Sequence, residues 1–317
     1  MKKIVIIGEC MIELNGEPFG KMWQAYGGDT LNTATYLARL SRRSELDVCY
    51  LSAMGNDNLS SAMIEKWQQD GINTDWVLRD PTRQAGLYLI QLDKQGERTF
   101  LYWRNQSAAR YLLQHPDYPT ILEQLSSADM IYLSGISLAI LPEQDRTLLI
   151  QQLISLARQG VEIAFDSNFR PHLWQSLEAA RQCYSTLLPH IHLALMTFDD
   201  EQLLWQDRNP QQAIQRLKQT GVKNIIIKIG AEGALIAQAN QQIVRVETKP
   251  ITNVVDTTAA GDAFNAGFLN GYLQGKPLTR CCEQGNQLAG VVIQHKGAII
   301  PKTATEHLLE EFNFNLL

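Results

Sequence analysis

The chain has 317 residues, 45% of them hydrophobic, which is enough apolar material for a large core. Its formal net charge of −5 at pH 7 disfavours nucleic acid or a membrane surface as a partner. Five cysteines occur without a CxxC pair, so we expect reduced thiols in a cytoplasmic protein and disfavour a disulfide framework or a structural zinc site. No apolar run reaches the roughly 20 residues that a membrane span needs.

Short apolar runs alternate with helical patterns along the chain. Strands are predicted at 4–9, 48–55, 130–136, 161–168, 193–197 and 224–230, and helices at 29–40, 59–70, 142–159, 210–220 and 263–273. Near-continuous apolar strands separated by helices indicate an α/β fold with a mostly parallel sheet that helices cover on both faces. We predict one such domain over residues 1–317.

Two segments, at about 10–25 and 85–104, break this alternation. The second segment is typical of a hairpin, with a strand over 86–92, a turn at 93–96 and a returning strand over 98–104. We predict that the two segments form a small antiparallel β lid, because flaps over the carboxyl ends of parallel strands often close active sites.

The stretch 255–264, Val-Asp-Thr-Thr-Ala-Ala-Gly-Asp-Ala-Phe, carries the strongest chemical signal. The small residues 259–261 allow backbone N–H groups at a helix start to face an anion. A carboxylate at Asp262 would repel a bound phosphate unless it had a task of its own, and taking a proton from an attacking hydroxyl is such a task. The alternative is a plain helix start capped by Asp256 or Thr258.

A second segment of this kind, 27–34, precedes the first predicted helix. Gly27 and Gly28 allow a ligand to approach the backbone closely, and Asp29 and Asn32 carry groups that can bind sugar hydroxyls. Taken alone, the segment is better explained as an ordinary helix start.

Two common phosphate-binding loops are absent from the sequence. The nearest string to GxxxxGK[ST], at 271–277, has the wrong spacing and no hydroxyl, and no two glycines lie two residues apart as GxGxxG requires. These absences disfavour kinases and GTPases built on a P-loop and dehydrogenases built on a dinucleotide-binding loop.

In order and spacing, the segment 27–32, the turn 228–234 and the motif 256–262 resemble the signatures of the ribokinase-like (PfkB) sugar kinases. The likeness extends from about residue 4 to about residue 302. The resemblance implies a central, mostly parallel sheet with a β lid, and transfer of the γ-phosphoryl group of ATP to a sugar hydroxyl with Mg²⁺. Because many relatives pair through the lid edge, it also implies a homo-oligomer formed through the lid.

The same resemblance implies roles for individual residues. Asp262 matches the catalytic base, and the N–H groups of Ala259, Ala260 and Gly261 match the anion hole. The residues implied to bind the nucleotide are Thr197, Lys228, Gly230, Glu232, Gly233 and Asn286.

The chain departs from the family pattern at two places. Ala259 stands where the family often has glycine, and we expect it to keep its role if its φ is negative. The family's Asn-x-x-Glu, which helps to organise Mg²⁺ and the phosphates, corresponds to Thr-Phe-Asp-Asp-Glu at 197–201. Thr197 replaces the asparagine, and either Asp200 or Glu201 supplies the carboxylate, through water. No direct metal ligand is assigned.

Two arginines bear on which sugar is bound. Arg104 ends the returning lid strand, and Arg170 follows the strand 161–168 at the sheet edge where ligands gather. Arginine matches a carboxylate with two parallel donors, and a neutral sugar offers no such partner. The alternative is that both arginines form structural salt bridges, for instance Arg170 with Asp166.

The patterns Asp-x-Asn-x-Arg-x-x-Leu-Trp at 166–174 and Tyr-x-Arg at 102–104 resemble the subgroup of this family that phosphorylates the sugar acid 2-keto-3-deoxygluconate. The resemblance implies 2-keto-3-deoxy-6-phosphogluconate as the product. The residues implied to bind the sugar acid are Gly28, Asp29, Asn32, Tyr88, Tyr102, Arg104, Ile136 and Arg170. Two alternatives remain: a fructokinase or other neutral-sugar kinase of the family, and a non-catalytic sugar-binding regulator.

Overall fold

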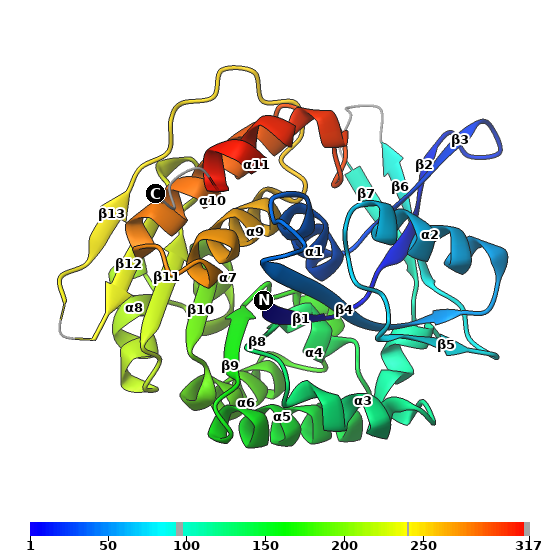
Figure 1. Ribbon diagram of the computed structural model, residues 1–317, viewed down its shortest axis with the longest axis horizontal. Helices are drawn as coiled ribbons and strands as arrows, with labels where there is room; N and C mark the ends of the chain where they lie inside the picture. The colour runs from blue at the N-terminus through cyan, green and yellow to red at the C-terminus, as the bar shows by residue number, and fades with distance from the viewer. Residues whose placement is uncertain (93–97, 240, 314–317) are drawn as a thin grey trace.

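The computed structural model describes residues 1–92, 98–239 and 241–313, so the predicted turn at 93–96 lies outside the described residues. Within them, one large sheet has the strand order β13-β12-β11-β10-β9-β8-β1-β4-β5 (Figure 1). Its strands are β1 (Lys2–Ile7), β4 (Leu46–Gly55), β5 (Val77–Asp80), β8 (Met130–Ser134), β9 (Glu162–Asp166), β10 (Leu193–Thr197), β11 (Asn224–Lys228), β12 (Ala234–Gln238) and β13 (Val244–Val246).

Neighbouring strands from β5 to β11 pair in parallel, and β12 and β13 add an antiparallel edge. The parallel strands are buried on both faces: Ile4 and Ile6 of β1 join one core cluster, and Val5 and Ile7 join the other. Successive side chains of a strand point to opposite faces, so this alternation requires a helical layer on each side of the sheet.

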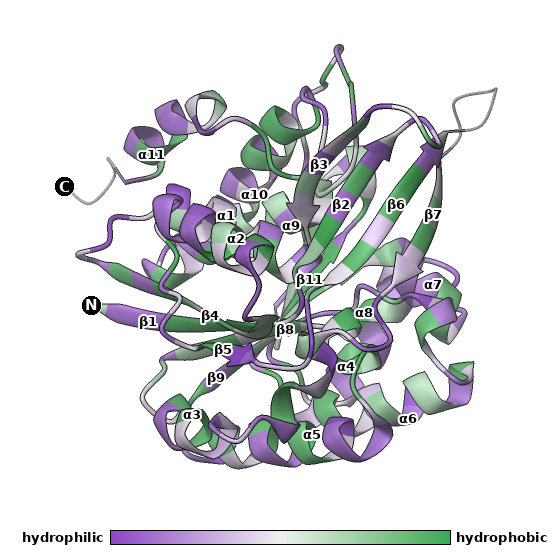
Figure 2. Ribbon diagram, turned by 90° about the vertical axis from the view of Figure 1, so that its right-hand side faces the viewer, coloured by the Kyte–Doolittle hydropathy of each residue, from purple (hydrophilic) through white to green (hydrophobic). Residues whose placement is uncertain are grey.

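Helices cover both faces of the sheet (Figures 1 and 2). On one face lie α1 (Asp29–Arg39), α2 (Asn58–Gln69), α9 (Ala260–Leu273), α10 (Leu278–Val292) and α11 (Glu306–Asn313). On the other lie α3 (Tyr118–Leu125), α4 (Gly135–Ala139), α5 (Glu143–Arg158), α6 (Leu177–Leu187), α7 (Phe198–Trp205) and α8 (Pro210–Gln219). Short 3₁₀ turns lie at Ala108–Gln114, Pro171–Leu173, Leu188–His190, Gly230–Glu232 and Lys302–Ala304.

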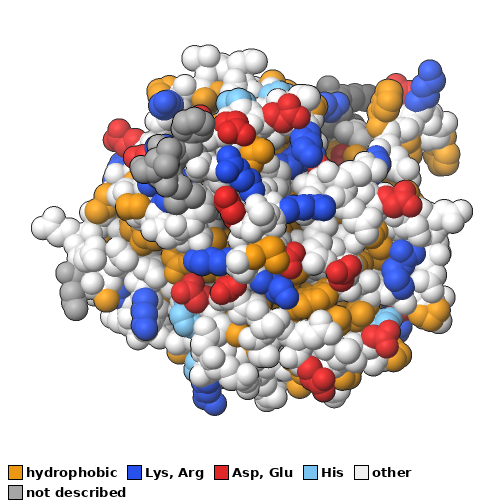
Figure 3. Space-filling view, viewed as in Figure 1, with side chains coloured by type: hydrophobic (Ala, Val, Ile, Leu, Met, Phe, Trp, Pro, Cys, Tyr) orange, Lys and Arg blue, Asp and Glu red, His pale blue; other side chains and the backbone are white. Residues whose placement is uncertain are grey.

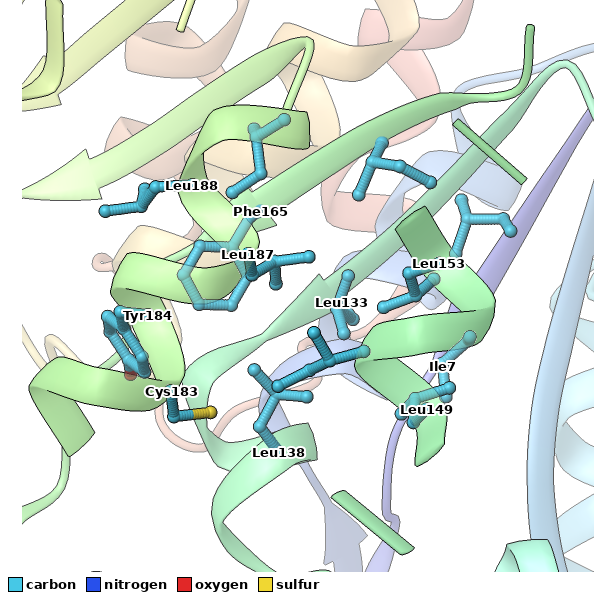
Figure 4. Packing of buried hydrophobic residues seen from close by; sticks show 14 of the residues in the cluster. Ile7, Leu133, Leu138, Leu149, Leu153, Phe165, Cys183, Tyr184, Leu187 and Leu188 are labelled. Atoms are coloured by element: carbon cyan, nitrogen blue, oxygen red, sulfur yellow. The ribbon is translucent and has the colours of Figure 1, made fainter. Parts of the chain in front are cut away.

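The core between the sheet and α5 and α6 is closely packed (Figure 4). Phe165 of β9 meets Tyr184 of α6 edge-on, with ring centroids 5.1 Å apart. Leu149 and Leu153 of α5 are fully buried beside them. Each such side chain contributes about 1.5–3 kcal/mol by leaving water, so the sheet is a rigid support for the loops at its carboxyl edge.

The second sheet has the order β3-β2-β6-β7 and comprises β2 (Met11–Gly16), β3 (Met22–Gly27), β6 (Gly86–Leu92) and β7 (Arg98–Trp103). Two antiparallel hairpins, β2–β3 and β6–β7, are joined by a parallel pairing of β2 with β6. Figure 2 shows these strands rising from one side of the main sheet. They come from the two segments expected to form the lid, and the predicted α/β class with a small second sheet is confirmed.

Every predicted strand and helix is present, with ends within three residues of those expected. The strand predicted at 130–136 ends early, at Ser134, because the chain turns there into α4. The Ser134 hydroxyl accepts a hydrogen bond from the Ser137 N–H, and the Ser137 hydroxyl accepts one from the Ser134 N–H. This reciprocal pair starts a helix, so Ile136 is helical rather than extended.

Charges of both signs are interspersed on the face of the molecule shown in Figure 3. Among the described residues, none of the helices combines the length and the apolar character that a crossing of the bilayer requires.

Candidate active site

A cavity of about 540 Å³ opens where the carboxyl ends of β9, β10 and β11 meet the amino end of α9, with lid residues forming part of its wall. Ligands of parallel α/β sheets gather at this edge. The structure brings these predicted site residues together on its wall: Gly28, Asp29, Asn32, Tyr88, Tyr102, Ile136, Arg170, Thr197, Asp200, Lys228, Ala259, Ala260, Gly261 and Asp262.

The amino end of α9 forms one wall of the cavity. The N-cap position is Ala259 and not Asp256 or Thr258, and the Asp256 carboxylate accepts hydrogen bonds from the N–H and the hydroxyl of Thr258. The Ala260 N–H donates to the Thr257 carbonyl at 3.2 Å. The remaining first-turn amides have no partner within the helix, so they are the groups of this turn that can face an anion.

The condition set for Ala259, a negative φ, is not met. Its φ is 61° and its ψ is 15°, in the left-handed region that favours glycine. An alanine there costs roughly 1–2 kcal/mol relative to a relaxed backbone. The turn therefore keeps the conformation that the family's glycine adopts readily, and the surrounding structure holds the alanine in it.

Asp262 lies on the cavity wall and is not sealed in the core. Burial raises its pKa to about 7, and the charges of Asp29 and Asp166 act in the same direction. The Asn32 amide donates to Asp262 Oδ2 at 2.8 Å and, with the Lys228 ammonium, lowers the pKa. A carboxylate that titrates near neutral pH is suited to accept a proton from an alcohol.

Asp29 begins α1 beside Asp262. Burial is the main cause that raises the pKa of Asp29, while hydrogen bonds from neighbouring groups lower it. One of these bonds comes from Asn168, whose amide donates to Asp29 Oδ2 at 2.6 Å. Asn168 follows β9 with a φ of 28°, a region that asparagine tolerates better than most residues. The amino ends of α1 and α9 and the carboxyl end of β9 thus lie together at the cavity.

Of the two glycines before α1, Gly28 is required by the packing of the protein itself. A Cβ at Gly28 would lie 2.1 Å from the Glu9 carbonyl oxygen, and one at Gly27 would lie 3.1 Å from the Tyr88 hydroxyl. Gly28 lines the cavity, but its missing side chain makes room for the chain after β1 and not for a ligand.

The two arginines lie in different environments. Arg170 is exposed and lines the cavity, with its Nη1 3.4 Å from Asp200 Oδ1. The expected example of a structural pair, Arg170 with Asp166, is wrong, because Asp166 pairs with Lys228. Arg104 is buried and bonded to Glu9, and it is not among the described residues that line the cavity. In this conformation a salt bridge accounts for Arg104.

The acidic segment 197–201 splits between the cavity and the core. Asp200 lines the cavity, and burial together with the Asp166 charge raises its pKa to about 6. Glu201 is buried away from the cavity beside Arg216, and burial raises its pKa to about 7. Of the two candidate carboxylates, Asp200 is therefore the one that can meet a ligand.

The residues implied to bind the nucleotide spread beyond this cavity. Glu232 lines a neighbouring cavity of about 560 Å³ together with Arg245, its salt-bridge partner at 2.8 Å. Gly230 and Gly233 shape the turn before it, with φ of 61° and 99°. Asn286 of α10 donates to the Val246 and Glu247 carbonyls, both at 3.3 Å. The described residues that line the two cavities do not include Asn286, Gly230 or Gly233.

Sequence reasoning missed several wall residues: Met11, Phe100, Asp166, Asn168, Asp199, Thr257, Thr258 and Ala298. Phe100 and Tyr102 both line the cavity, and two-residue spacing on a strand could have identified Phe100. Asp166 and Asn168 belong to the motif at 166–174, but no binding role was predicted for them. Ala298 comes from the loop after α10, and nothing local marks it.

Comparison with known proteins agrees with this geometry. The profile described as pfkB family carbohydrate kinase matches residues 1–305. A protein of Haemophilus influenzae named 2-dehydro-3-deoxygluconokinase is 62% identical over 314 residues, which are 99% of this chain and 100% of that protein. A protein of Dickeya dadantii with the same name is 45% identical over 305 residues, covering 96% of this chain and 98% of its own.

Among solved structures, an Escherichia coli protein described as ribokinase II, in complex with ATP and Mg²⁺, superposes with a TM-score of 0.83 at 23% identity. The match covers 98% of this chain and 99% of that one, and it shows that the two share a fold. The profile match over nearly the whole length, the two similar sequences and the site at the sheet edge lead to one conclusion: the chain belongs to the pfkB family of carbohydrate kinases.

Proposed function

We propose that this protein transfers the γ-phosphoryl group of ATP to 2-keto-3-deoxygluconate (2-dehydro-3-deoxygluconate) and forms 2-keto-3-deoxy-6-phosphogluconate. The observation that carries the proposal is the Asp262 carboxylate, which lies on the cavity wall at the amino end of α9 with a pKa raised to about 7. The names of the two similar proteins, at 62% and 45% identity, support the substrate.

In the proposed reaction the primary hydroxyl of the sugar acid attacks the γ-phosphorus of ATP in line. Asp262 accepts the hydroxyl proton, the bond between the γ-phosphorus and the bridging oxygen breaks, and ADP leaves. The first-turn amides of α9 oppose the charge of the group in transit. The lid closes over the site and excludes water that would otherwise compete as acceptor.

At the other end of the sugar, Arg170 is proposed to hold the carboxylate. It is exposed at the wall, and its 3.4 Å contact with Asp200 can be exchanged for a substrate. Tyr88, Tyr102 and Ile136 complete that end. Arg104 is proposed to join them by leaving its salt bridge with Glu9. Its guanidinium carbon already lies 5.9 Å from the Tyr102 ring centroid.

ATP is proposed to lie along Thr197, Lys228, the turn 230–233 and Asn286, with Mg²⁺ beside its phosphates. Mg²⁺ prefers carboxylate and water ligands, and Asp199 and Asp200 both line the cavity. Burial and the Asp166 charge disfavour the charged form of Asp200 and raise its pKa, and a cation bound beside it would offset both effects, so the residues present fit the ion. When bound, Mg²⁺ neutralises charge on the β- and γ-phosphate oxygens.

The whole chain is proposed to act as one domain and to associate through the lid. Short connections join the lid to the main sheet, such as the step from Ile7 of β1 to Met11 of β2. Leu101 and Trp103 alternate with the cavity-facing residues of β7, so they lie on the outer face of the lid, where both are exposed. A second copy of this chain would cover them. The five buried free thiols fit a cytoplasmic location.

A coupled assay of ADP formation tests the substrate. The purified protein should turn over MgATP with 2-keto-3-deoxygluconate far faster than with fructose or ribose. Arg170→Ala should raise KM for the acid by about 10–100-fold, since a charged hydrogen bond contributes about 1.5–3 kcal/mol. Arg280→Ala, which removes a surface arginine paired with Glu283, is the matched control and should leave KM unchanged. Preference for fructose would favour the neutral-sugar kinase, and binding without turnover would favour a regulator.

A further inference from the structure

Beneath the amino end of α9, a buried polar network joins three strands to the helix. Lys228 Nζ, at the end of β11, lies 3.3 Å from each carboxylate oxygen of Asp166, at the end of β9. The same ammonium donates to Asn265 Oδ1 of α9 at 3.0 Å. The Asn265 amide in turn donates to Asp166 Oδ2 at 2.7 Å and to the Tyr132 hydroxyl at 3.0 Å.

All four members of this network are buried, yet Lys228 also lies on the cavity wall. A Cβ built at Gly261 would be 3.8 Å from Lys228 Nζ, the nearest described atom apart from its chain neighbours and the backbone of its own helix. The ammonium therefore lies next to the turn at the amino end of α9, and residues of both line the cavity. An ammonium group has three donors, and Asp166 and Asn265 fix the direction in which it points.

We propose that Lys228 is a catalytic residue whose ammonium faces the phosphoryl group during transfer, and that Asp166 and Asn265 are positioning residues that hold it under the α9 turn. The inference rests on the proposed kinase function, and it assigns the Lys228 ammonium a role in the phosphoryl transfer. A buried ammonium is expensive to leave unpaired, which explains why a carboxylate and an amide oxygen bind it. A fixed charge that needs no reorganisation stabilises a group in transit more than a mobile one does.

The network also acts on the base. Asp262 is faced by Asp29 and Asn32 from α1, by Asp166 from β9 and by Lys228 from β11; Tyr36 of α1 and Tyr132 of β8 also lie within its field. Asp166 raises the pKa of Asp262, and Lys228 lowers it. Loss of Lys228 should therefore move the acidic limb of the kcat/KM profile to higher pH, and loss of the Asp166 charge should move it to lower pH.

The experiment compares Lys228→Met, Asp166→Asn and Asn265→Ala with the wild type at saturating MgATP over pH 5–9. Lys228→Met should lower kcat by about 10²–10³, the usual cost of removing one group that stabilises charge in transit, with KM for the sugar acid nearly unchanged. Its acidic limb should move up by about one pH unit, and that of Asp166→Asn should move down. Asn265→Ala should lower kcat without moving the limb, because the amide carries no charge.

Two further variants keep the test decisive. The double variant Lys228→Met/Asp166→Asn removes both buried charges, so it should fold where either single variant is unstable, and it should remain slow. Lys276→Met removes a partly buried lysine at the carboxyl end of α9 and should change neither kcat nor the limb.

Nucleotide binding separates this inference from the choice of sugar. In calorimetry with Mg²⁺ and without sugar, Lys228→Met should reduce the preference for the β,γ-imido analogue of ATP over ADP by about tenfold or more. An unchanged preference, or a Lys228→Met enzyme with kcat within twofold of the wild type, would overturn the role of Lys228. A wild type that binds the analogue but does not phosphorylate the acid would instead contradict the proposed substrate.

Discussion

Asp262 shows how a single position balances function against stability. The residue occupies the first turn of α9, where the amide groups favour a negative charge, yet burial and two neighbouring carboxylates oppose ionisation. The result is a carboxyl group that holds its proton up to about pH 7. Such a group is available as a base in mildly alkaline solution. Its poorly solvated charge lowers the stability of the folded protein there.

Asp262→Asn should separate the two effects. We expect kcat to fall by about 10²–10⁴ while nucleotide binding is kept. The folded pKa of Asp262, about 7, is above the ordinary value of 3.8, so the stability that its proton provides is lost as pH rises from about 4 to about 7. Asparagine does not titrate, so the variant should be more stable than the wild type by roughly 1–3 kcal/mol at pH 8, with little difference at pH 4. Urea unfolding at the two pH values measures this, and a variant less stable at pH 8 would contradict the assignment.

Ala259 stores strain one helical turn away. Because its φ is 61°, replacement by glycine removes a steric cost but adds freedom to the unfolded chain. We expect Ala259→Gly to be at least as stable as the wild type, by up to about 1 kcal/mol, with kcat within a fewfold. Ala259→Val should lose both stability and activity, because a branched side chain fits this region poorly. Thermal unfolding and the ADP assay check both variants.

At the scale of the element, the position of α9 depends on how closely α10 approaches it. A Cβ at Gly267 would lie 2.6 Å from the Gln284 carbonyl oxygen, and one at Gly285 would lie 2.8 Å from Phe264. Glycines at these positions let the two backbones touch, and the contact fixes where the amino end of α9 meets the cavity. Packing between helices thereby sets the geometry of the site.

Gly267→Ala should force these helices apart. Overpacking of this kind costs about 1–3 kcal/mol, and the shift of α9 should also lower kcat. Gly290→Ala on α10 is the matched control: its Cβ would meet only Ile251 side-chain atoms, at 3.4 and 3.6 Å. That change should be neutral or stabilising by up to about 1 kcal/mol, because alanine favours the helix. Equal losses in both variants, measured by denaturant unfolding and turnover, would show that close packing is not the cause.

At the scale of the whole molecule, the lid presents two faces with different tasks. One face carries Phe100 and Tyr102 into the cavity, and the other exposes Leu101 and Trp103. An exposed apolar sheet face is a surface that association would cover. The stacking of Tyr102 on His172, with centroids 5.9 Å apart, already joins the lid to the body on the cavity side.

Trp103→Glu should therefore convert an oligomer to a monomer without unfolding it. Trp103 is 57% exposed, so the charge is tolerated in the monomer but would be buried in an interface. Sedimentation should show the loss of association, and the control Leu203→Glu on α7, where the side chain is 52% exposed, should sediment like the wild type. A wild type that is already monomeric at micromolar concentration would contradict the proposed association.

Much of the framework could be read from residues alone. Strands such as 193–197 are continuous apolar runs, and helices such as 210–220 have clear starts, so both were placed closely. Strands β5, β12 and β13 and the helices α3, α4, α6, α7, α10 and α11 were not predicted from the sequence. The 197–201 segment remained ambiguous because both carboxylates lie in one helical turn, and their different environments, Asp200 at the cavity and Glu201 beside Arg216, depend on tertiary contacts.

The α/β framework, the lid segments and the small turn before Asp262 were predictable from the sequence because they depend on local composition, period and spacing, and the family was identified from the resemblance of three motifs. The folded chain was needed to find the left-handed backbone of Ala259, the pairing of Arg104 with Glu9, the raised pKa of Asp262 and the network around Lys228. The last three arise between residues far apart in the chain, where burial and neighbouring charges act through space, so no local sequence pattern indicates them.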